Sequence, residues 1–346
     1  MKRLIYIGSQ YLGHTPDDGE TMKNQLMREA ISPYFDKVIP IDLRKRPTRF
    51  VHLLKLGWYA AFYRNTTILL SASVWVAYKI LIVLYLLHRK HNVYYWVVGG
   101  LFDKLLVSKQ IKIKYYRGLE KIIVQGKLME ANVLKSGLSQ VLTVPNSKKI
   151  DYFPKHIVTT NQVRRFVFLS RIIPEKGVEE LLSVVSNINL KYKNIFELDF
   201  YGRLDKQYES RFLSLIDSYD NVSYKGLLDL TTSNGYDILS RYDMMVFPTF
   251  YHGEGFPGVI IDAYISGLPV IASDWRENPN VITHGSNGVI YPTHDISALE
   301  TAMVSAINGD FDIATMSHNS RVEANKYDIR NIITKELLLK IGLINN

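Results

Sequence analysis

Two carboxylates eight residues apart mark the segment of this sequence that is best suited to binding a ligand. Glu254 lies in a glycine-rich loop, HGEGFPG, after the apolar run MMVFP, and Asp262 lies in the helix predicted to follow it. Free amide groups at the start of a helix point outward and attract anionic or polar ligands. Glu254 and Asp262 could therefore hold the two ends of one extended polar ligand.

Glycines and a proline give this loop its expected shape. Gly253, Gly255 and Gly258 have no Cβ, so the backbone can approach a ligand closely. Pro257 is predicted at the first position of the helix, where its missing N–H group costs nothing. GLP then ends the helix, and VIAS is predicted to form a buried strand.

Cations follow other predicted strands of the same half of the chain. In FLSRIIPEKG, Arg171 comes directly after a strand and Lys176 stands at the start of a helix. Two cations beside the positive end of a helix form an anion site of about the size of a pyrophosphate. Further candidates at two more strand ends, where backbone groups could bind a flat base, are Gly202, Arg203, Gly226 and Leu227. A lone cation is usually a solvated surface charge, but several at the strand ends of one sheet favour a ligand site.

The order of predicted elements indicates an α/β protein with two domains. Strand and helix patterns alternate in each half, which favours doubly wound parallel sheets with helices on both faces. We predict one domain over residues 1–158, a second over 159–330, and a terminal segment over 331–346 that packs near the interdomain region. Only short helices are expected after Gly288, with a terminal helix over 335–343. Ligands bind at the carboxyl ends of strands in such sheets, so a cleft between the domains is the expected site.

The segments SRIIPEKGVEELL and FPTFYHGEGFPGVIIDAYISGLPVIASD resemble the donor-binding domain of family 4 glycosyltransferases. VPN, which ends at Asn146, resembles the end of the acceptor domain of that family. The family contains retaining enzymes of the GT-B fold, of the kind found in bacterial polysaccharide and capsule biosynthesis. The resemblance therefore implies two Rossmann-like domains facing across a cleft, and a nucleotide-sugar bound between them without a required metal.

The resemblance also implies a role for each candidate residue. Arg171 and Lys176 would neutralise the diphosphate, Glu254 would hold the donor sugar, and Asp262 would hold the ribose hydroxyls. The family usually has Glu where this chain has Asp262, so here the carboxylate has a shorter reach. The predicted catalytic residues are Glu254, Arg171 and Lys176. The predicted donor-binding residues are Gly19, Arg171, Lys176, Gly202, Arg203, Gly226, Leu227, His252, Glu254, Gly255, Phe256, Gly258 and Asp262.

The first half is expected to supply the acceptor side. Gly99, Gly100 and Asp103 follow the predicted strand YYWVV, where members of the family often have a histidine or a glycine loop. This chain has no histidine there, and we expect His88 and His91 to be solvated residues at a helix end. The three residues Gly99, Gly100 and Asp103 are therefore the predicted acceptor site.

The chemistry implied is transfer of a sugar with retention. Fixed cations and amides aimed at the departing diphosphate would stabilise its growing negative charge. Attack on the face that the nucleotide leaves would retain the configuration, and no side-chain nucleophile is then required. We expect a UDP-sugar as co-substrate, a glycan or lipid-linked acceptor, and no cofactor or metal. Two alternatives stay open: a nucleotide-sugar epimerase on the same fold, and a non-catalytic glycosyltransferase-like binding partner.

The charge of the chain is unevenly distributed. Residues 1–150 contain 24 Lys and Arg against 9 Asp and Glu, whereas residues 151–346 contain 18 against 24. A basic half favours an anionic membrane surface. Nucleic acid is not expected, because no nucleic-acid-binding motif is recognisable. The cluster RKRPTR at 44–49 is a solvated turn or a contact with lipid headgroups.

One apolar segment bears on whether the protein contacts a membrane. Residues 66–87 form a 22-residue apolar stretch, almost long enough to span a bilayer, but Lys79 interrupts it. Strand, helix and strand is the preferred interpretation, with the helix packed on a sheet; the alternative leaves one face of the helix on lipid. The chain has no cysteine, which excludes disulfides. We expect a cytoplasmic protein, peripheral on the inner face of the membrane.

Overall fold

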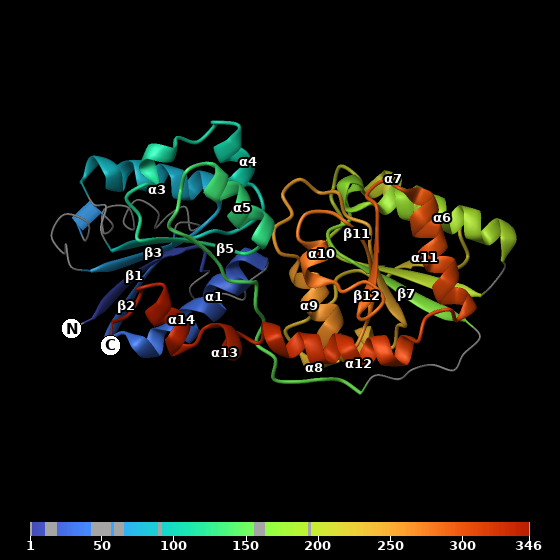
Figure 1. Ribbon diagram of the computed structural model, residues 1–346. Helices are drawn as coiled ribbons and strands as arrows, with labels where there is room; N and C mark the ends of the chain where they lie inside the picture. Colours follow the sequence, from blue (N-terminus) through green and yellow to red (C-terminus); the bar gives the residue numbers. More distant parts are fainter. Residues whose placement is uncertain are drawn as a thin grey trace. The chain divides into compact units, whose positions relative to one another are not determined.

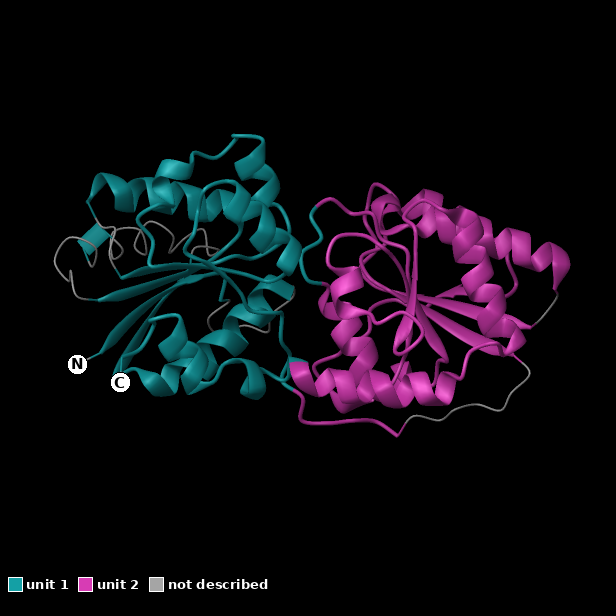
Figure 2. Cartoon of the chain, in the orientation of Figure 1, with its two compact units in different colours: residues 1–149, 253–256, 327–346 teal, residues 150–252, 257–326 magenta. Residues whose placement is uncertain are grey.

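The computed structural model describes residues 2–10, 19–42, 57–58, 66–88, 92–155, 163–192 and 195–345. The basic cluster at 44–49, His91 and the predicted boundary at 158–159 lie outside these residues. The chain forms two compact units, which Figure 2 shows in different colours. Unit 1 comprises residues 1–149, 253–256 and 327–346, and unit 2 comprises residues 150–252 and 257–326. The short loop that carries Glu254 therefore belongs to unit 1 by its contacts.

The described part of unit 1 contains a parallel sheet with the strand order β2-β1-β3-β4-β5-β6. Its strands are β1 (Arg3–Gly8), β2 (Lys37–Asp42), β3 (Thr67–Ser71), β4 (Val93–Trp96), β5 (Lys121–Val124) and β6 (Val141–Thr143). Its described helices are α1 (Gly19–Ile31), α3 (Val74–Leu86), α4 (Phe102–Val107), α5 (Lys127–Lys135), α13 (Ile329–Ile332) and α14 (Lys335–Lys340). A short 3₁₀ helix, η2 (Ile113–Tyr115), lies between α4 and β5 in the sequence.

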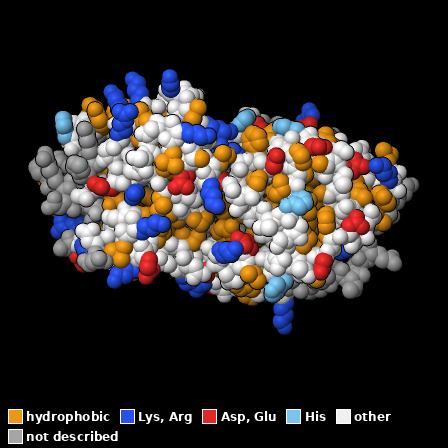
Figure 3. Space-filling view, in the orientation of Figure 1, with side chains coloured by type: hydrophobic (Ala, Val, Ile, Leu, Met, Phe, Trp, Pro, Cys, Tyr) orange, Lys and Arg blue, Asp and Glu red, His pale blue; other side chains and the backbone are white. Residues whose placement is uncertain are grey.

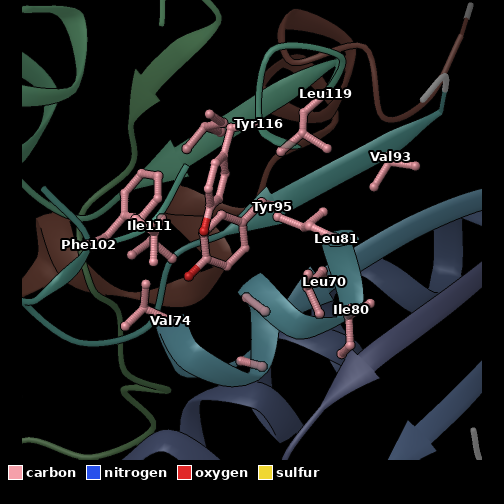
Figure 4. Packing of buried hydrophobic residues seen from close by; sticks show 14 of the residues in the cluster. Leu70, Val74, Ile80, Leu81, Val93, Tyr95, Phe102, Ile111, Tyr116 and Leu119 are labelled. Carbon is pink, nitrogen blue, oxygen red and sulfur yellow. The ribbon is translucent and has the colours of Figure 1, made fainter. Parts of the chain in front are cut away.

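Helices cover both faces of this sheet. α3, α4 and α5 pack on one face, and α1, α13 and α14 pack on the other (Figure 1). In the first layer the rings of Tyr95, Phe102 and Tyr116 pack together, with centroids 5.2 to 6.2 Å apart (Figure 4). Successive strand residues point to opposite faces, so a sheet buried on both faces requires the continuous apolar strands seen in the sequence.

The last helices of the chain complete the core of unit 1. Ile329 and Leu338 are buried in the same cluster as Leu4 and Tyr6 of β1. The hydroxyl of Tyr94 donates a hydrogen bond to the carbonyl oxygen of Gly342. Strand β1 and helix α14 therefore share one core.

α3 lies between β3 and β4 in the sequence, as the strand–helix–strand interpretation requires. One side of α3 is buried on the sheet through Val74, Ala77, Ile80, Leu81 and Leu84. None of the helices in the described ranges is both long enough and apolar enough to cross a membrane.

The described part of unit 2 contains a second parallel sheet, with the strand order β12-β11-β10-β7-β8-β9. Its strands are β7 (Arg164–Leu169), β8 (Phe196–Tyr201), β9 (Val222–Tyr224), β10 (Met244–Phe247), β11 (Val270–Ser273) and β12 (Gly288–Tyr291). Its described helices are α6 (Val178–Lys191), α7 (Glu209–Ile216), α8 (Ser233–Leu239), α9 (Gly258–Ile265), α10 (Asn278–Val281), α11 (Ile296–Asn308) and α12 (Ile313–Ala324). α6 packs against α11, and α12 packs against α9.

The two sheets confirm the predicted α/β architecture of two Rossmann-like domains, and three local predictions are wrong. Pro257 caps α9 instead of occupying its first turn, because α9 begins at Gly258. The region after Gly288 holds strand β12 and two helices of 13 and 12 residues, α11 and α12, where only short helices were expected. The terminal helix ends at Lys340, three residues earlier than predicted.

Candidate functional site

Two cations share one aromatic ring at the carboxyl ends of strands in unit 2. Arg171 follows β7, and Lys176 ends the 3₁₀ turn η3 (Pro174–Lys176) before α6. Cζ of Arg171 lies 4.9 Å from the centroid of the Tyr251 ring, and Nζ of Lys176 lies 5.2 Å from the same centroid. Nζ of Lys176 also lies 5.2 Å from the centroid of the Phe247 ring. Because ring faces attract cations, Tyr251 holds two positive charges near each other.

The two cations differ in exposure. Lys176 is only 5% exposed, whereas Arg171 is exposed. Burial of an ammonium group costs free energy unless its surroundings compensate the charge, and the rings of Phe247 and Tyr251 supply part of that compensation. Lys176 is therefore a fixed positive charge, and Arg171 is the more adjustable of the two.

The loop after β10 is packed against the turn before α6. Gly177 has a φ of 77°, and a Cβ at this position would lie 2.1 Å from the carbonyl oxygen of Pro248. The amide of Phe250 donates a hydrogen bond of 2.9 Å to the carbonyl oxygen of Glu175. Only glycine tolerates both that backbone angle and that approach. The PEKG turn therefore determines where the Tyr251 ring can lie.

Trp275, which follows β11, fixes the backbone of Tyr251. Nε1 of Trp275 donates a hydrogen bond of 2.8 Å to the carbonyl oxygen of Tyr251. The Trp275 ring also packs edge-on against His252, with 5.5 Å between the ring centroids. His252, a predicted donor-binding residue, is thus in contact with an aromatic side chain of unit 2.

Sequence reasoning did not single out Tyr251 or Trp275. Aromatic residues in loops have no periodicity that distinguishes a ligand site from ordinary packing. The available signal was the aromatic pair Phe250 and Tyr251, placed directly before the HGEG motif and therefore at a strand end.

Two predicted glycines lie on neighbouring strand ends beside Arg171. Gly202 follows β8, and a Cβ there would lie 1.6 Å from the carbonyl oxygen of Ser170. The amide of Gly202 donates to the carbonyl oxygen of Gly226 at 2.9 Å. The structure thus brings Arg171, Gly202 and Gly226 to the ends of three adjacent strands, β7, β8 and β9.

Arg203 and Leu227 directly follow these two glycines, so they lie at the same strand ends. The carbonyl oxygen of Arg203 accepts a hydrogen bond of 2.9 Å from the amide of Ile172. Leu227 is 71% exposed, which is unusual for a leucine and leaves it open to contact with a ligand.

Asp262 is buried on α9. Its Oδ1 atom accepts a hydrogen bond of 3.0 Å from the hydroxyl of Tyr236 on α8. Burial, followed by the negative charge of Asp262, raises the pKa of Tyr236 well above its usual value. Asp262 therefore already has a protein partner, and its predicted contact with ribose stays a prediction.

The loop from Gly253 to Phe256 packs within unit 1. The amide of Gly100 donates a hydrogen bond of 3.2 Å to the carbonyl oxygen of Gly253. A Cβ at Gly100 would lie 1.8 Å from the carbonyl oxygen of Glu254. Nδ2 of Asn146 donates to the carbonyl oxygen of Phe256 at 3.4 Å. The backbone of Gly100 and the side chain of Asn146 therefore hold the segment that carries Glu254.

Of the predicted acceptor residues, Gly99 and Gly100 lie against that loop, and Asp103 lies in the interior of unit 1. A Cβ at Gly255 would lie 3.2 Å from the carbonyl carbon of Gly99, so the two backbones are close. Asp103 on α4 is fully buried, and Nδ2 of Asn132 on α5 donates a hydrogen bond of 2.8 Å to its carboxylate. Gly19 is the first residue of α1. The ligand-binding roles of these residues stay predictions.

Most of the known proteins to which this chain is similar are named as glycosyltransferases, and one is named as an exopolysaccharide phosphotransferase. Residues 163–309 match the family model described as "Glycosyl transferases group 1". The capsular polysaccharide biosynthesis glycosyltransferase CapM of Staphylococcus aureus is 26% identical over 227 residues, which cover 61% of this chain and 57% of CapM. The UDP-Gal:alpha-D-GlcNAc-diphosphoundecaprenol alpha-1,3-galactosyltransferase of Escherichia coli is 25% identical over 224 residues, which cover 63% of this chain and 56% of that enzyme. The matches thus span less than two thirds of either relative.

A solved structure extends the similarity to the whole chain. HepE of Anabaena, in complex with UDP, has a TM-score of 0.76 and 14% sequence identity, and the match covers 99% of this chain and 100% of HepE. The fold is GT-B. The match of unit 2 to the group 1 family model and the GT-B fold of the chain confirm the resemblance to glycosyltransferases. Assignment of this GT-B chain to family 4 stays a prediction.

Replacement of Tyr251 by leucine tests whether its ring holds Arg171 and Lys176 in place. Tyr251→Leu keeps apolar volume but removes the ring face. With the UDP-sugar co-substrate that the sequence predicts, we expect affinity for UDP to fall about tenfold, since a cation–π contact contributes about 0.5 to 2 kcal/mol. Affinity for uridine, which has no phosphate, should not change. Titration calorimetry measures both, and Tyr251→Phe, which keeps the ring, is the matched control. An equal loss for UDP and uridine would contradict this role.

Replacement of Gly100 by alanine tests the backbone packing under Glu254. Gly100→Ala introduces a Cβ against the Glu254 carbonyl, so we expect the free energy of unfolding to fall by about 1 to 3 kcal/mol. Urea unfolding measures this change. Gly19→Ala is the control, because a Cβ there meets nothing within 4 Å. Equal stability of the two variants would show that the close approach at Gly100 is not required.

Proposed function

We propose that this chain is a retaining, metal-independent glycosyltransferase of family 4 that moves a sugar from a UDP-sugar to a glycan or lipid-linked acceptor in polysaccharide biosynthesis. The observation that carries the proposal is the pair Arg171 and Lys176, held together on Tyr251 at the strand ends of unit 2. This pair lies in the segment that matches the group 1 glycosyltransferase model. A UDP-sugar as donor is supported by the Escherichia coli relative, which is named for UDP-Gal, and by the UDP complex of HepE. The name of CapM supports a role in polysaccharide biosynthesis.

The cations suit the leaving group of such a transfer. As the bond between the sugar C1 and the diphosphate oxygen breaks, negative charge grows on the diphosphate. Fixed positive charges that need no reorganisation stabilise this charge in the transition state. Lys176, buried against two rings, supplies such a fixed charge, and Arg171 adds a second. Two cations can supply the charge that a metal ion supplies in other phosphate chemistry, which supports a metal-independent reaction.

The proposed reaction retains the configuration at C1. The acceptor oxygen forms its bond to C1 on the face that the diphosphate leaves, and the acceptor proton passes to the diphosphate. No side chain then has to act as a nucleophile. Glu254 and the amides of its loop hold the donor sugar in this proposal, and Asp262, with Tyr236, holds the ribose. The residues proposed to bind the base and the adjoining phosphate are Gly202, Arg203, Gly226 and Leu227.

The acceptor is assigned to the basic half of the chain. Residues 1–150 carry 24 Lys and Arg against 9 Asp and Glu, which supports work at an anionic membrane surface. The Escherichia coli relative is named for an acceptor linked to diphosphoundecaprenol. A lipid-linked acceptor on the cytoplasmic face of the membrane accounts for both observations.

A transfer assay tests the proposal. Purified protein is incubated with UDP-, GDP- and dTDP-sugars and a membrane extract, and release of nucleotide is followed with and without EDTA. We expect release from a UDP-sugar that requires the extract and persists in EDTA, and a product whose anomeric configuration is retained by NMR. Lys176→Met should lower kcat/KM about 100-fold or more, because it removes a charge that stabilises the transition state.

The control for charge is Lys191→Met, which removes an exposed lysine at the far end of α6 that pairs with Glu300. Glu254→Gln should also reduce transfer. If the protein isomerised the sugar of the nucleotide-sugar in the absence of membrane extract, it would be a nucleotide-sugar epimerase. If neither Lys176→Met nor Glu254→Gln reduced sugar transfer, the catalytic roles of these residues would be refuted, and a non-catalytic binding protein would be favoured.

A further inference from the structure

The side of α3 that faces away from the sheet is apolar. Trp75, Val83 and Leu86 are 45%, 48% and 67% exposed. Residues three or four positions apart lie on the same side of a helix, so these three side chains form one stripe along α3. The opposite side of α3 is buried in the core of unit 1 (Figure 4). A surface helix normally carries polar residues on its outer side, so this stripe requires an explanation.

A single charge lies within the stripe. Lys79 is exposed and stands four residues after Trp75 and four before Val83. A lysine can lay its aliphatic stem along an apolar surface and extend its ammonium group to a polar boundary. The pattern of Trp75, Lys79, Val83 and Leu86 is therefore compatible with burial at the boundary between hydrocarbon and headgroups.

Aromatic contacts hold a basic segment beside the stripe. The ring of Tyr115 in η2 lies 5.6 Å from Tyr78 and 5.2 Å from Tyr85, both on α3. The amide of Lys112 donates a hydrogen bond of 3.3 Å to the hydroxyl of Tyr78. Nζ of Lys114 lies 5.0 Å from the centroid of the Tyr115 ring. The segment around η2 is thus fixed next to α3.

This segment adds cations and a further apolar residue. Lys109, Lys112, Lys114 and Arg117 are exposed, and Val107, at the end of α4, is 64% exposed. From residue 66 to 119 the sequence has eight Lys and Arg and one carboxylate, Asp103. Asp103 is fully buried, so it cannot neutralise the surface. Figure 3 shows Lys and Arg side chains projecting from the upper edge of unit 1, where α3 and α4 lie.

We propose that this surface, defined by Trp75, Lys79, Val83, Leu86, Val107, Lys109, Lys112, Lys114 and Arg117, docks unit 1 on an anionic lipid bilayer. The stripe enters the boundary of the acyl chains, and the cations contact acidic headgroups. Nucleic acid offers charge but no apolar layer for the stripe. A second copy of the chain would bring like charges together, which disfavours association. The inference rests on the proposed function, because the docking surface is where the protein would reach a lipid-linked acceptor in the membrane.

Vesicle binding by the full chain tests the docking surface. Flotation is measured with phosphatidylcholine vesicles and with vesicles that also contain phosphatidylglycerol. We expect binding only to the anionic vesicles, weakened by salt. Lys109→Gln, Lys112→Gln and Lys114→Gln together should lower the partition coefficient about 100-fold, since each surface cation contributes about a factor of five.

The matched control for charge is the triple variant Lys37→Gln, Lys335→Gln and Lys340→Gln, which removes three exposed lysines of unit 1 outside this surface. The stripe is tested by Val83→Ser with Leu86→Ser, against Leu190→Ser in unit 2, which alters a leucine that is 83% exposed. Both surface variants should lose binding, and both controls should keep it.

UDP affinity, measured on the same proteins by thermal shift, separates this inference from the proposed function. If the surface variants lose vesicle binding and keep the UDP affinity of the unmodified protein, the docking surface is supported. Vesicle binding through this surface by a protein that neither binds UDP nor transfers sugar would refute the proposed function and leave the docking surface intact. Equal vesicle binding by the surface variants and their controls would overturn the inference. So would a stripe variant that abolishes self-association in light scattering and leaves vesicle binding unchanged.

Discussion

The attraction of Arg171 and Lys176 to the ring of Tyr251 is the interaction on which the candidate site depends. Two like charges repel, and each would gain solvation by extending into water. The ring offers both cations a common partner at 4.9 and 5.2 Å. Tyr251 can reach them only because the loop after β10 lies against the PEKG turn and Trp275 fixes its carbonyl group. The close placement of the two cations is therefore a product of loop packing, and the motif that carries them does not create it alone.

Direct backbone packing gives these loops their rigidity. At Gly100, Gly177 and Gly202 a Cβ would lie 1.8, 2.1 and 1.6 Å from the carbonyl oxygens of Glu254, Pro248 and Ser170. Main-chain groups have no rotamers to lose, so such contacts define the positions of amides and carbonyls more tightly than side-chain packing does. Electrostatic stabilisation works best when the dipoles are set before the reaction begins. Glycine thus serves two purposes here, since it lets the backbone approach and it also fixes the groups that follow.

Periodic features of the fold were predictable, and loop contacts were not. The apolar runs at β1, β4, β7 and β10 predicted the two parallel sheets, because strands buried on both faces leave a continuous signal. The stretch from Gly288 was interpreted as short helices only, since β12 has just four residues and its identity depends on pairing with β11. Arg171, Lys176 and Glu254 were found from motifs. Tyr251, Trp275 and the Tyr236 partner of Asp262 were not, because they meet these residues only through tertiary packing.

The shared core of β1 and α14 has a consequence for synthesis of the chain. Leu4 and Tyr6 are made long before their buried partners Ile329 and Leu338, which follow all of unit 2 in the sequence. Domains generally fold as units while the chain is still being translated. The core of unit 2 needs no residue beyond 326, whereas one sheet face of unit 1, covered in part by α1, is completed only when α13 and α14 have been made. Until then, the apolar residues of β1 that face α13 and α14 lack part of their native packing.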